Sequence, residues 1–90
     1  MVKPYSDKHR TDGTWLRIFY AERPSDELVW HRDHNDRTIF VKEGTGWQIQ
    51  FDNELPKPLQ LGETYDIPKN VYHRIIKGED TLVISIKERT

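Results

Sequence analysis

The sequence contains no cysteine and only one methionine among its 90 residues. The lack of cysteine excludes disulfide bonds, thiolate metal sites and a cysteine nucleophile, and it is consistent with a reducing compartment. No stretch approaches the roughly 20 apolar residues of a membrane span, and the first segment, MVKPYSDKHRTDG, lacks the apolar core of a signal peptide. We therefore expect a cytoplasmic protein that does not act at a membrane.

The chain also lacks an excess of either charge, with 14 basic and 15 acidic residues and a formal net charge of −1. Because a nucleic-acid binder needs a stripe of cations to neutralise phosphates, no nucleic-acid partner is expected. Apolar residues make up only 34% of the chain, so three tryptophans, four tyrosines and three phenylalanines must supply much of the core. A core this thin favours a homodimer, in which a second subunit covers apolar surface.

No repeat, low-complexity tract or long linker divides the chain, which predicts one domain. Residues 1–13 are polar and end in the turn signal Asp12-Gly13, which indicates an N-terminal arm or a loosely held edge. Residues 14–90 then form the domain itself. The only helix signal is Ser25-Asp26-Glu27, which is too brief for more than one turn.

Residues 14–90 carry the alternating pattern of β-strands. Seven short segments rich in β-branched and aromatic residues are separated by turns that contain glycine or proline: 14–21, 28–31, 38–41, 46–52, 64–67, 72–76 and 81–87. Their spacing of about eight to twelve residues predicts an all-β sandwich or barrel.

The alternation assigns faces to two of these strands. In residues 81–87, one face is apolar and carries Leu82, Ile84 and Ile86. In residues 46–52, one face is apolar and carries Trp47, Ile49 and Phe51. The opposite face of 46–52 carries Gln48 and Gln50. These glutamines either face solvent or line a polar pocket inside a barrel, and the sequence leaves both alternatives open.

The segment GETYDIPKNVYHRIIK, residues 62–77, resembles the second sequence motif of the cupin superfamily. Gly62, Pro68 and His73 stand at the positions that the motif requires, and Asn70 stands where the family usually has glycine. Asparagine accepts a positive φ better than most residues, so this substitution is a mild one.

The segment LVWHRDHNDR, residues 28–37, resembles the first cupin motif by its spacing to Gly44. His31 matches the first histidine of that motif, Asp33 replaces the second histidine, and Arg37 replaces the glutamate. The two motifs together cover residues 31–77, about half of the chain. The resemblance implies a small single-domain cupin, a double-stranded β-helix or jelly-roll barrel, with a degenerate metal-binding motif.

In cupins, three histidines and a glutamate typically hold a divalent ion inside the barrel. Carried over to this sequence, the resemblance gives His31, Asp33 and His73, a set of two histidines and one carboxylate as in non-haem Fe(II) oxygenases. His31 and Asp33 are two apart and would share one face of a strand. A bend could add His34 as a fourth ligand. The implied cofactor is a divalent metal: Fe, Mn, Ni or Zn.

Arg37 favours other interpretations of the same residues. A guanidinium cannot coordinate a metal, and beside a divalent cation it adds like-charge repulsion. It could instead pair with Asp33 in a bidentate ion pair, or hold an anionic ligand at the mouth of the barrel. Without a metal, His31 or His73 could act as a general base that Asp33 orients.

Three functions follow from these alternatives. The first is binding of a small anionic or sugar-like molecule in the barrel, through His31, Asp33, Arg37, Gln48, Gln50 and His73. The second is a metal-dependent enzyme, an oxygenase, isomerase or epimerase of the cupin type, with His31, Asp33 and His73 as ligands. The third is a dimeric structural or interaction protein without catalysis. The sequence names no substrate.

Overall fold

The computed structural model describes residues 5–22 and 28–89, and all regular elements in these residues are β-strands. The strands are β1 (Tyr5–His9), β2 (Trp15–Phe19), β3 (Asp36–Glu43), β4 (Gln48–Phe51), β5 (Lys57–Pro58), β6 (Thr64–Ile67), β7 (His73–Ile76) and β8 (Leu82–Arg89). The helical turn expected at Ser25–Glu27 lies outside the described residues. Within the described residues, no helix is long and apolar enough to cross a membrane.

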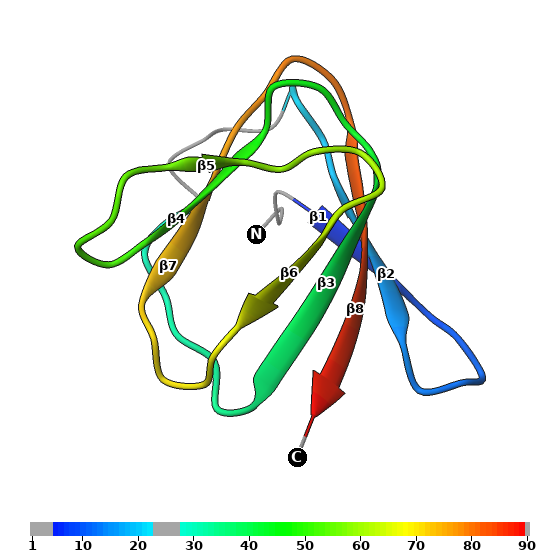
Figure 1. Cartoon of the computed structure of the whole chain (residues 1–90). Helices are drawn as coiled ribbons and strands as arrows, with labels where there is room; N and C mark the ends of the chain where they lie inside the picture. Colours follow the sequence, from blue (N-terminus) through cyan, green and yellow to red (C-terminus); the bar gives the residue numbers. More distant parts are fainter. Residues whose placement is uncertain (1–4, 23–27, 90) are drawn as a thin grey trace.

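The strands form two antiparallel sheets that face each other (Figure 1). The larger sheet has the strand order β1-β2-β8-β3-β6, and the smaller one has the order β5-β4-β7. Strands that are neighbours in a sheet are often far apart in the chain, since β8 pairs with both β2 and β3. This arrangement is an all-β jelly roll, as the family resemblance implied, and it agrees with the sandwich or barrel that the strand spacing predicted.

The core lies between the two sheets. Strict alternation on β8 buries one face and leaves the other more exposed, as predicted from the sequence, and β4 shows the same alternation. The buried apolar residues come from both sheets and the segments between them: Phe19, Ile39, Val41, Trp47, Ile49, Phe51, Leu59, Ile67, Ile75, Leu82, Ile84 and Ile86. His73 is the one buried polar residue among those described, at 2% exposure.

Three segments differ from the sequence-based expectation. Residues 28–31 were predicted to form a strand, but only His31 makes a β-bridge, with His73. The polar segment at the start of the chain, expected to be an arm or a loosely held edge, lies at the edge of the larger sheet but forms a strand there, β1, which was not among the seven predicted. The proline-rich connection contains the two-residue strand β5, which pairs with β4. Charged and proline-containing edge strands lack the apolar alternation that reveals interior strands.

Two turns, each of which connects a strand of one sheet to a strand of the other, close one end of the barrel, at the top of Figure 1. The Glu79 amide donates to the Thr45 carbonyl at 2.9 Å, and the Thr45 amide donates to Asp80 Oδ1 at 2.7 Å. The Trp47 indole Nε1 donates to the Asp80 carbonyl at 2.8 Å, while its ring is only 1% exposed. A Cβ at Gly78 would lie 2.5 Å from the Trp47 ring, so this contact requires glycine.

Candidate metal centre

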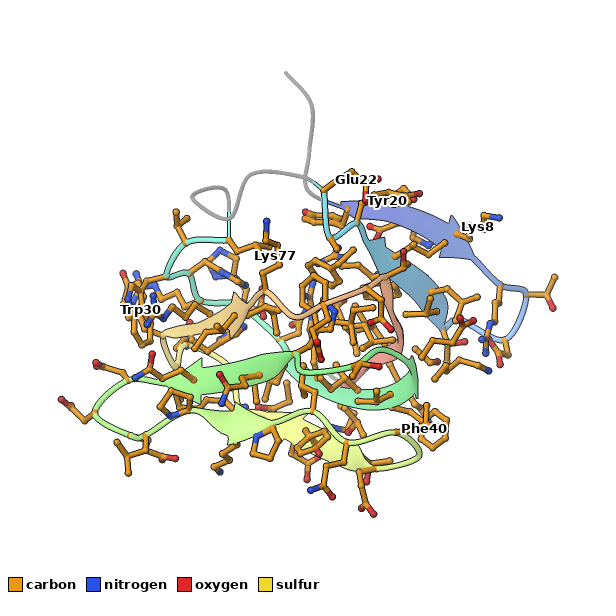
Figure 2. All side chains as sticks on the ribbon, turned by 90° about the horizontal axis from the view of Figure 1, so that it is seen from above. Lys8, Tyr20, Glu22, Trp30, Phe40 and Lys77 are labelled. Atoms are coloured by element: carbon orange, nitrogen blue, oxygen red, sulfur yellow. The ribbon has the colours of Figure 1, made fainter. Side chains whose placement is uncertain are left out.

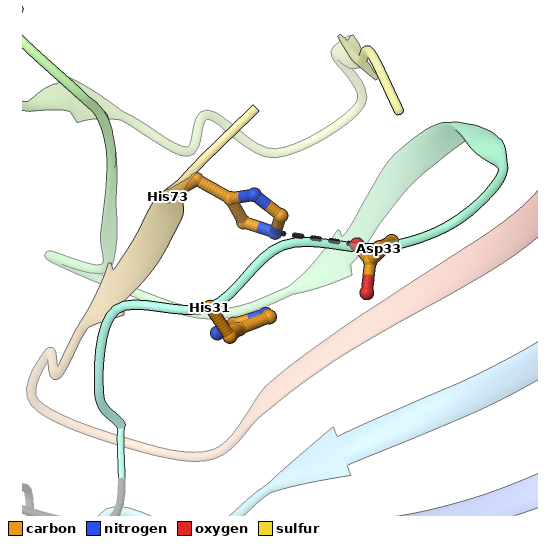
Figure 3. Close-up of side chains that lie close together, drawn as sticks. All are labelled: His31, Asp33 and His73. Carbon is orange, nitrogen blue, oxygen red and sulfur yellow. Dashed lines mark ion pairs between the residues drawn. The ribbon is translucent and has the colours of Figure 1, made fainter. Parts of the chain in front are cut away.

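Three side chains with metal-binding chemistry meet at the other end of the barrel. His31 and Asp33 lie on the segment that leads into β3, and His73 is the first residue of β7 (Figure 3). One ligand atom from each of the three lies within 4.8 Å of the others. The sequence-based expectation that these residues form one cluster therefore agrees with the geometry.

The backbone fixes the relative position of the two histidines. The His31 amide donates to the His73 carbonyl at 3.0 Å, and the His73 amide donates to the His31 carbonyl at 2.9 Å. Residues that exchange both bonds in an antiparallel pair carry their side chains on the same face. The two imidazole rings accordingly lie edge to face, with centroids 4.4 Å apart.

Asn70 holds the third residue in place. Its backbone amide donates to the Asp33 carbonyl at 2.8 Å, which ties the loop before β7 to the segment before β3. Asn70 has a φ of 63°, the left-handed conformation that glycine at this motif position would allow. The expectation that asparagine would tolerate a positive φ here is confirmed.

Hydrogen bonds to the backbone set the tautomer of both histidines. His31 Nδ1 lies 2.8 Å from the Val29 carbonyl, and His73 Nδ1 lies 2.9 Å from the Val71 carbonyl. Because a carbonyl oxygen only accepts, each Nδ1 must carry the proton and donate it. In a neutral imidazole, Nε2 then has a free lone pair. This is the arrangement found in histidine ligands of metals, where the second ring nitrogen binds a backbone carbonyl or a carboxylate.

Asp33 presents an oxygen without a hydrogen bond to this pair. Its Oδ2 is buried, has no hydrogen-bond partner among the described residues, and lies 3.4 Å from His73 Nε2. Burial lowers the pKa of His73, and the hydrogen bond to Val71 and the charge of Asp33, which act to raise the pKa, do not offset this effect. His73 is therefore neutral near pH 7, and a carboxylate oxygen faces a nitrogen lone pair with no proton between them.

Arg37 points toward the same site from β3 and contacts two carboxylates. Its Nη1 lies 3.3 Å from Asp33 Oδ1, and its Nε and Nη2 lie 3.0 Å and 2.9 Å from Glu88 Oε2. The expected ion pair with Asp33 therefore forms, but through one guanidinium nitrogen only. The bidentate arrangement is wrong because Glu88, opposite Arg37 in the β3–β8 register, occupies the other nitrogens. Asp33 Oδ2 makes no hydrogen bond and faces His73.

A cavity of about 350 Å³ opens beside the three residues. Its walls combine these side chains and Arg37 with isoleucines of both sheets, among them Ile39, Ile75 and Ile84. His73 is buried, Asp33 is half-buried, and His31 is exposed. One side of the cluster is thus open toward solvent while the other is apolar.

Three other residues proposed from the sequence lie elsewhere. Gln48 and Gln50 are on the face of β4 opposite the buried one and do not line the cavity. Gln50 accepts a hydrogen bond from Arg74 Nε at 2.9 Å and donates one to the Glu54 carbonyl at 3.0 Å. His34 is exposed and is not part of the cluster, because the chain at this point is a loop and not the continued strand.

Sequence reasoning missed Glu88, Arg17 and Tyr5. Glu88 shares the inward face of β8 with Ile86. The alternation predicted for residues 81–87 would have placed Glu88 on this face if the strand had been extended to residue 88. Arg17 and Tyr5 line the cavity from β2 and β1. No signal in the sequence marks Tyr5, because β1 was not recognised as a strand.

The donor set fits a divalent transition metal. Two imidazole nitrogens and one carboxylate oxygen are ligands that suit Fe(II), Mn(II), Ni(II) and Zn(II), and three protein ligands leave coordination positions for other molecules. The unpaired buried oxygen of Asp33 is an independent sign, because buried polar atoms in proteins are normally hydrogen-bonded. Glu88 offsets the charge of Arg37, which reduces the repulsion between this guanidinium and a cation.

No protein-family model matches the chain, and no curated protein matches it in sequence. Solved structures do match. A cupin-2 domain protein from Shewanella frigidimarina has 28% identity and a TM-score of 0.70, covering 99% of this chain and 85% of its own. A cupin-like protein from Thermotoga maritima has 23% identity and a TM-score of 0.64, covering 82% and 54%. FeII HppE has 18% identity and a TM-score of 0.67, covering 94% and 48%.

Proposed function

We propose that this chain, which has the cupin fold, is a metal-dependent enzyme that holds one divalent ion with His31, Asp33 and His73. The observation that carries the proposal is the pair of Asp33 Oδ2 and His73 Nε2. Two lone-pair donors 3.4 Å apart repel each other unless a proton or a metal ion lies between them, and burial of His73 disfavours the proton.

Fe(II) is the first metal to test. Two histidines and one carboxylate are the ligand set of non-haem Fe(II) oxygenases. FeII HppE shares the fold of this chain, although it covers the chain at only 18% identity and is about twice as long. Mn(II), Ni(II) and Zn(II) suit the same donors and are alternatives within this proposal. When bound, the metal supplies a Lewis acid that polarises a substrate oxygen.

The side chains around the site have separate tasks in this proposal. The Val29 and Val71 carbonyls bind the Nδ1 atoms of the two imidazole rings, which leaves both Nε2 atoms available to a metal. Arg37 binds Asp33 Oδ1 and thereby turns Oδ2 toward the histidines. The isoleucines of the cavity exclude water from its inner wall. Oxygenase, isomerase and epimerase reactions all suit such a site.

Metal analysis of matched histidine variants tests the proposal. The untagged protein, purified without chelator and with Fe(II) supplied in the absence of oxygen, is expected to contain about one metal per chain. His31→Gln removes a ligand and should abolish metal uptake, because one of three protein donors is lost. His34→Gln changes an exposed histidine three residues away and should leave uptake intact. Equal metal content in the two variants would contradict the proposal.

A second function, binding of a small molecule without metal, is favoured by one observation. Arg37 already contacts Asp33, so part of the carboxylate charge is compensated without a cation. Under this alternative, His31 or His73 would serve as a hydrogen-bonding group or general base. It predicts a folded protein that takes up none of the four metals and a cavity that contains an organic ligand.

We also propose, as expected from the sequence, that the protein is a cytoplasmic homodimer. Large apolar side chains on the surface support an interface: Trp30 is 41% exposed, Phe40 39% and Tyr72 44%. Figure 2 shows Trp30 and Phe40 on the outside, away from each other, so one interface would cover only one of them. Light scattering on the purified protein would measure the mass in solution, and a monomer would contradict this part of the proposal.

A further inference from the structure

Among the described residues, two arginines line the cavity, and they differ in how many of their donors are used. All three guanidinium nitrogens of Arg37 contact a carboxylate: Nε and Nη2 contact Glu88, and Nη1 contacts Asp33. Arg37 therefore has little left to offer a ligand, and its contacts make it a positioning residue for Asp33. The role of anion clamp that the sequence suggested for Arg37 does not fit this geometry.

Arg17 is bound on one edge only. Its Nε donates to Asp7 Oδ1 at 2.8 Å and its Nη2 donates to Asp7 Oδ2 at 2.9 Å, a bidentate ion pair. A guanidinium has five N–H donors in a planar fork. The ion pair with Asp7 uses the edge formed by Nε and Nη2, so the edge between Nη1 and Nη2 remains available to a ligand. Nη1 makes no hydrogen bond or ion pair with the described part of the chain.

The position of Arg17 is well defined. Its side chain is only 16% exposed, and its guanidinium carbon lies 4.0 Å from the centroid of the Tyr5 ring. Burial acts to lower the pKa of Arg17, but the hydrogen bonds and charge of Asp7 outweigh it and raise the pKa, so the group stays cationic. A guanidinium fixed on one side by a carboxylate and on one face by an aromatic ring loses little entropy when it binds a second anion.

The charge around the cavity changes sign when a metal binds. Among the described residues, the ion pairs at the cavity comprise three carboxylates, Asp7, Asp33 and Glu88, and two guanidiniums, Arg17 and Arg37, a formal charge of −1. A divalent cation held by His31, Asp33 and His73 would convert this to +1. With the metal bound, the cavity would attract a ligand that carries one negative charge. Without the metal, the cavity would repel the same ligand.

We propose that Arg17 binds the carboxylate of a small substrate with one negative charge and an apolar body, and that this anion and the metal strengthen each other's binding. The apolar body follows from the apolar side chains that also line the cavity, among them Phe19, Ile39, Ile75 and Ile84. This inference rests on the proposed function, because the metal supplies the positive charge. By thermodynamic linkage, the anion raises the affinity for metal by the same factor.

Benzoate and its neutral isostere benzamide are suitable probes. Zn²⁺ is first titrated into the full chain by calorimetry, and each probe is then titrated into the Zn²⁺-loaded protein and into protein treated with EDTA. We expect benzoate to bind roughly tenfold or more tightly when Zn²⁺ is present, whereas benzamide should show no such gain. Equal binding of the two probes, or equal benzoate affinity with and without Zn²⁺, would overturn the inference.

Arg17→Gln should weaken benzoate binding to the Zn²⁺-loaded protein roughly tenfold or more, because a charge-assisted bidentate contact is lost. Its Zn²⁺ affinity without benzoate should not fall. Arg32→Gln is the matched control, because Arg32 is exposed and stacks on Tyr72 outside the cavity. Arg32→Gln should bind benzoate like the wild type.

The outcomes separate this inference from the proposed function. Zn²⁺ binding without an effect of Arg17→Gln on benzoate would mean that benzoate contacts only the metal, and would refute the role of Arg17. No Zn²⁺ binding in the first titration would refute the proposed function and this inference together. If Arg17→Gln does not fold, Arg17→Lys keeps a charge beside Asp7 but lacks the planar fork, and a benzoate affinity equal to wild type would equally refute the role.

Discussion

The two ends of the barrel each carry an aspartate but differ in how its polar atoms are used. At the closed end, Asp80 accepts from the Thr45 amide with its side chain and from the Trp47 indole with its carbonyl. At the site end, Asp33 keeps Oδ2 buried without a hydrogen bond. The first arrangement stabilises the fold, whereas the second leaves binding capacity for a ligand. Changes at the closed end should therefore affect stability, and changes at the site end should affect binding.

Trp47→Ala is the largest expected perturbation and should act on stability alone. Deleting a buried tryptophan removes its packing and its bond to Asp80, which costs about 3–5 kcal/mol of unfolding free energy. Urea unfolding followed by circular dichroism would measure the loss. Trp30→Ala is the control, because Trp30 is 41% exposed and its removal should cost far less. Equal losses in the two variants would remove the distinction between core and surface on which this comparison depends.

Arg37→Lys should act on metal binding and leave stability almost unchanged. A lysine keeps the positive charge but cannot span Asp33 and Glu88 as the guanidinium does, so Asp33 loses its orientation. Loss of such an outer partner typically costs 10- to 100-fold in metal affinity. Arg74→Lys provides the control on the outer face of β7. Calorimetric titration with Zn²⁺ would test this expectation, and an unchanged affinity in Arg37→Lys would show that Asp33 does not need Arg37.

The pH dependence of stability should be the smallest effect and should come from the site end. Burial lowers the pKa of His73 below its ordinary value of 6.5, so below pH 6.5 the unfolded chain binds a proton that the folded chain does not. The stability of the metal-free protein should therefore fall as the pH drops below 6.5, until His73 is also protonated in the folded state. Denaturant unfolding in EDTA at several pH values would show this, and His73→Gln should flatten the slope.

The sequence predicted the strands that have an apolar face well, and it missed the strands made of charged or proline-containing residues. Alternation identified β6 residue for residue and the buried face of β8, because both strands are exposed on one side. It failed at 28–31, where apolar residues lie in a loop with Val29 57% exposed. It also missed β1, whose charged residues lie at a sheet edge. The cupin resemblance is confirmed as the fold.

At the site, the sequence identified residues but not their partners. Motif spacing brought together His31, Asp33 and His73, and the positive φ of Asn70 was foreseen. The contact between Arg37 and Glu88 spans 51 residues and depends on the β3–β8 register, which no local pattern reveals. Likewise, Arg17 enters the cavity only because β2 lies next to β8 in the larger sheet.

The central claim is that Asp33 Oδ2 and the two Nε2 atoms bind one metal. A crystal structure of the full chain grown with Zn²⁺, with anomalous data collected on both sides of the zinc absorption edge, tests it most directly. We expect one anomalous peak per chain, about 2.0–2.2 Å from His31 Nε2, His73 Nε2 and Asp33 Oδ2, with Arg37 still bound to Oδ1. A peak elsewhere on the surface, with these three atoms unchanged and without metal, would contradict the account.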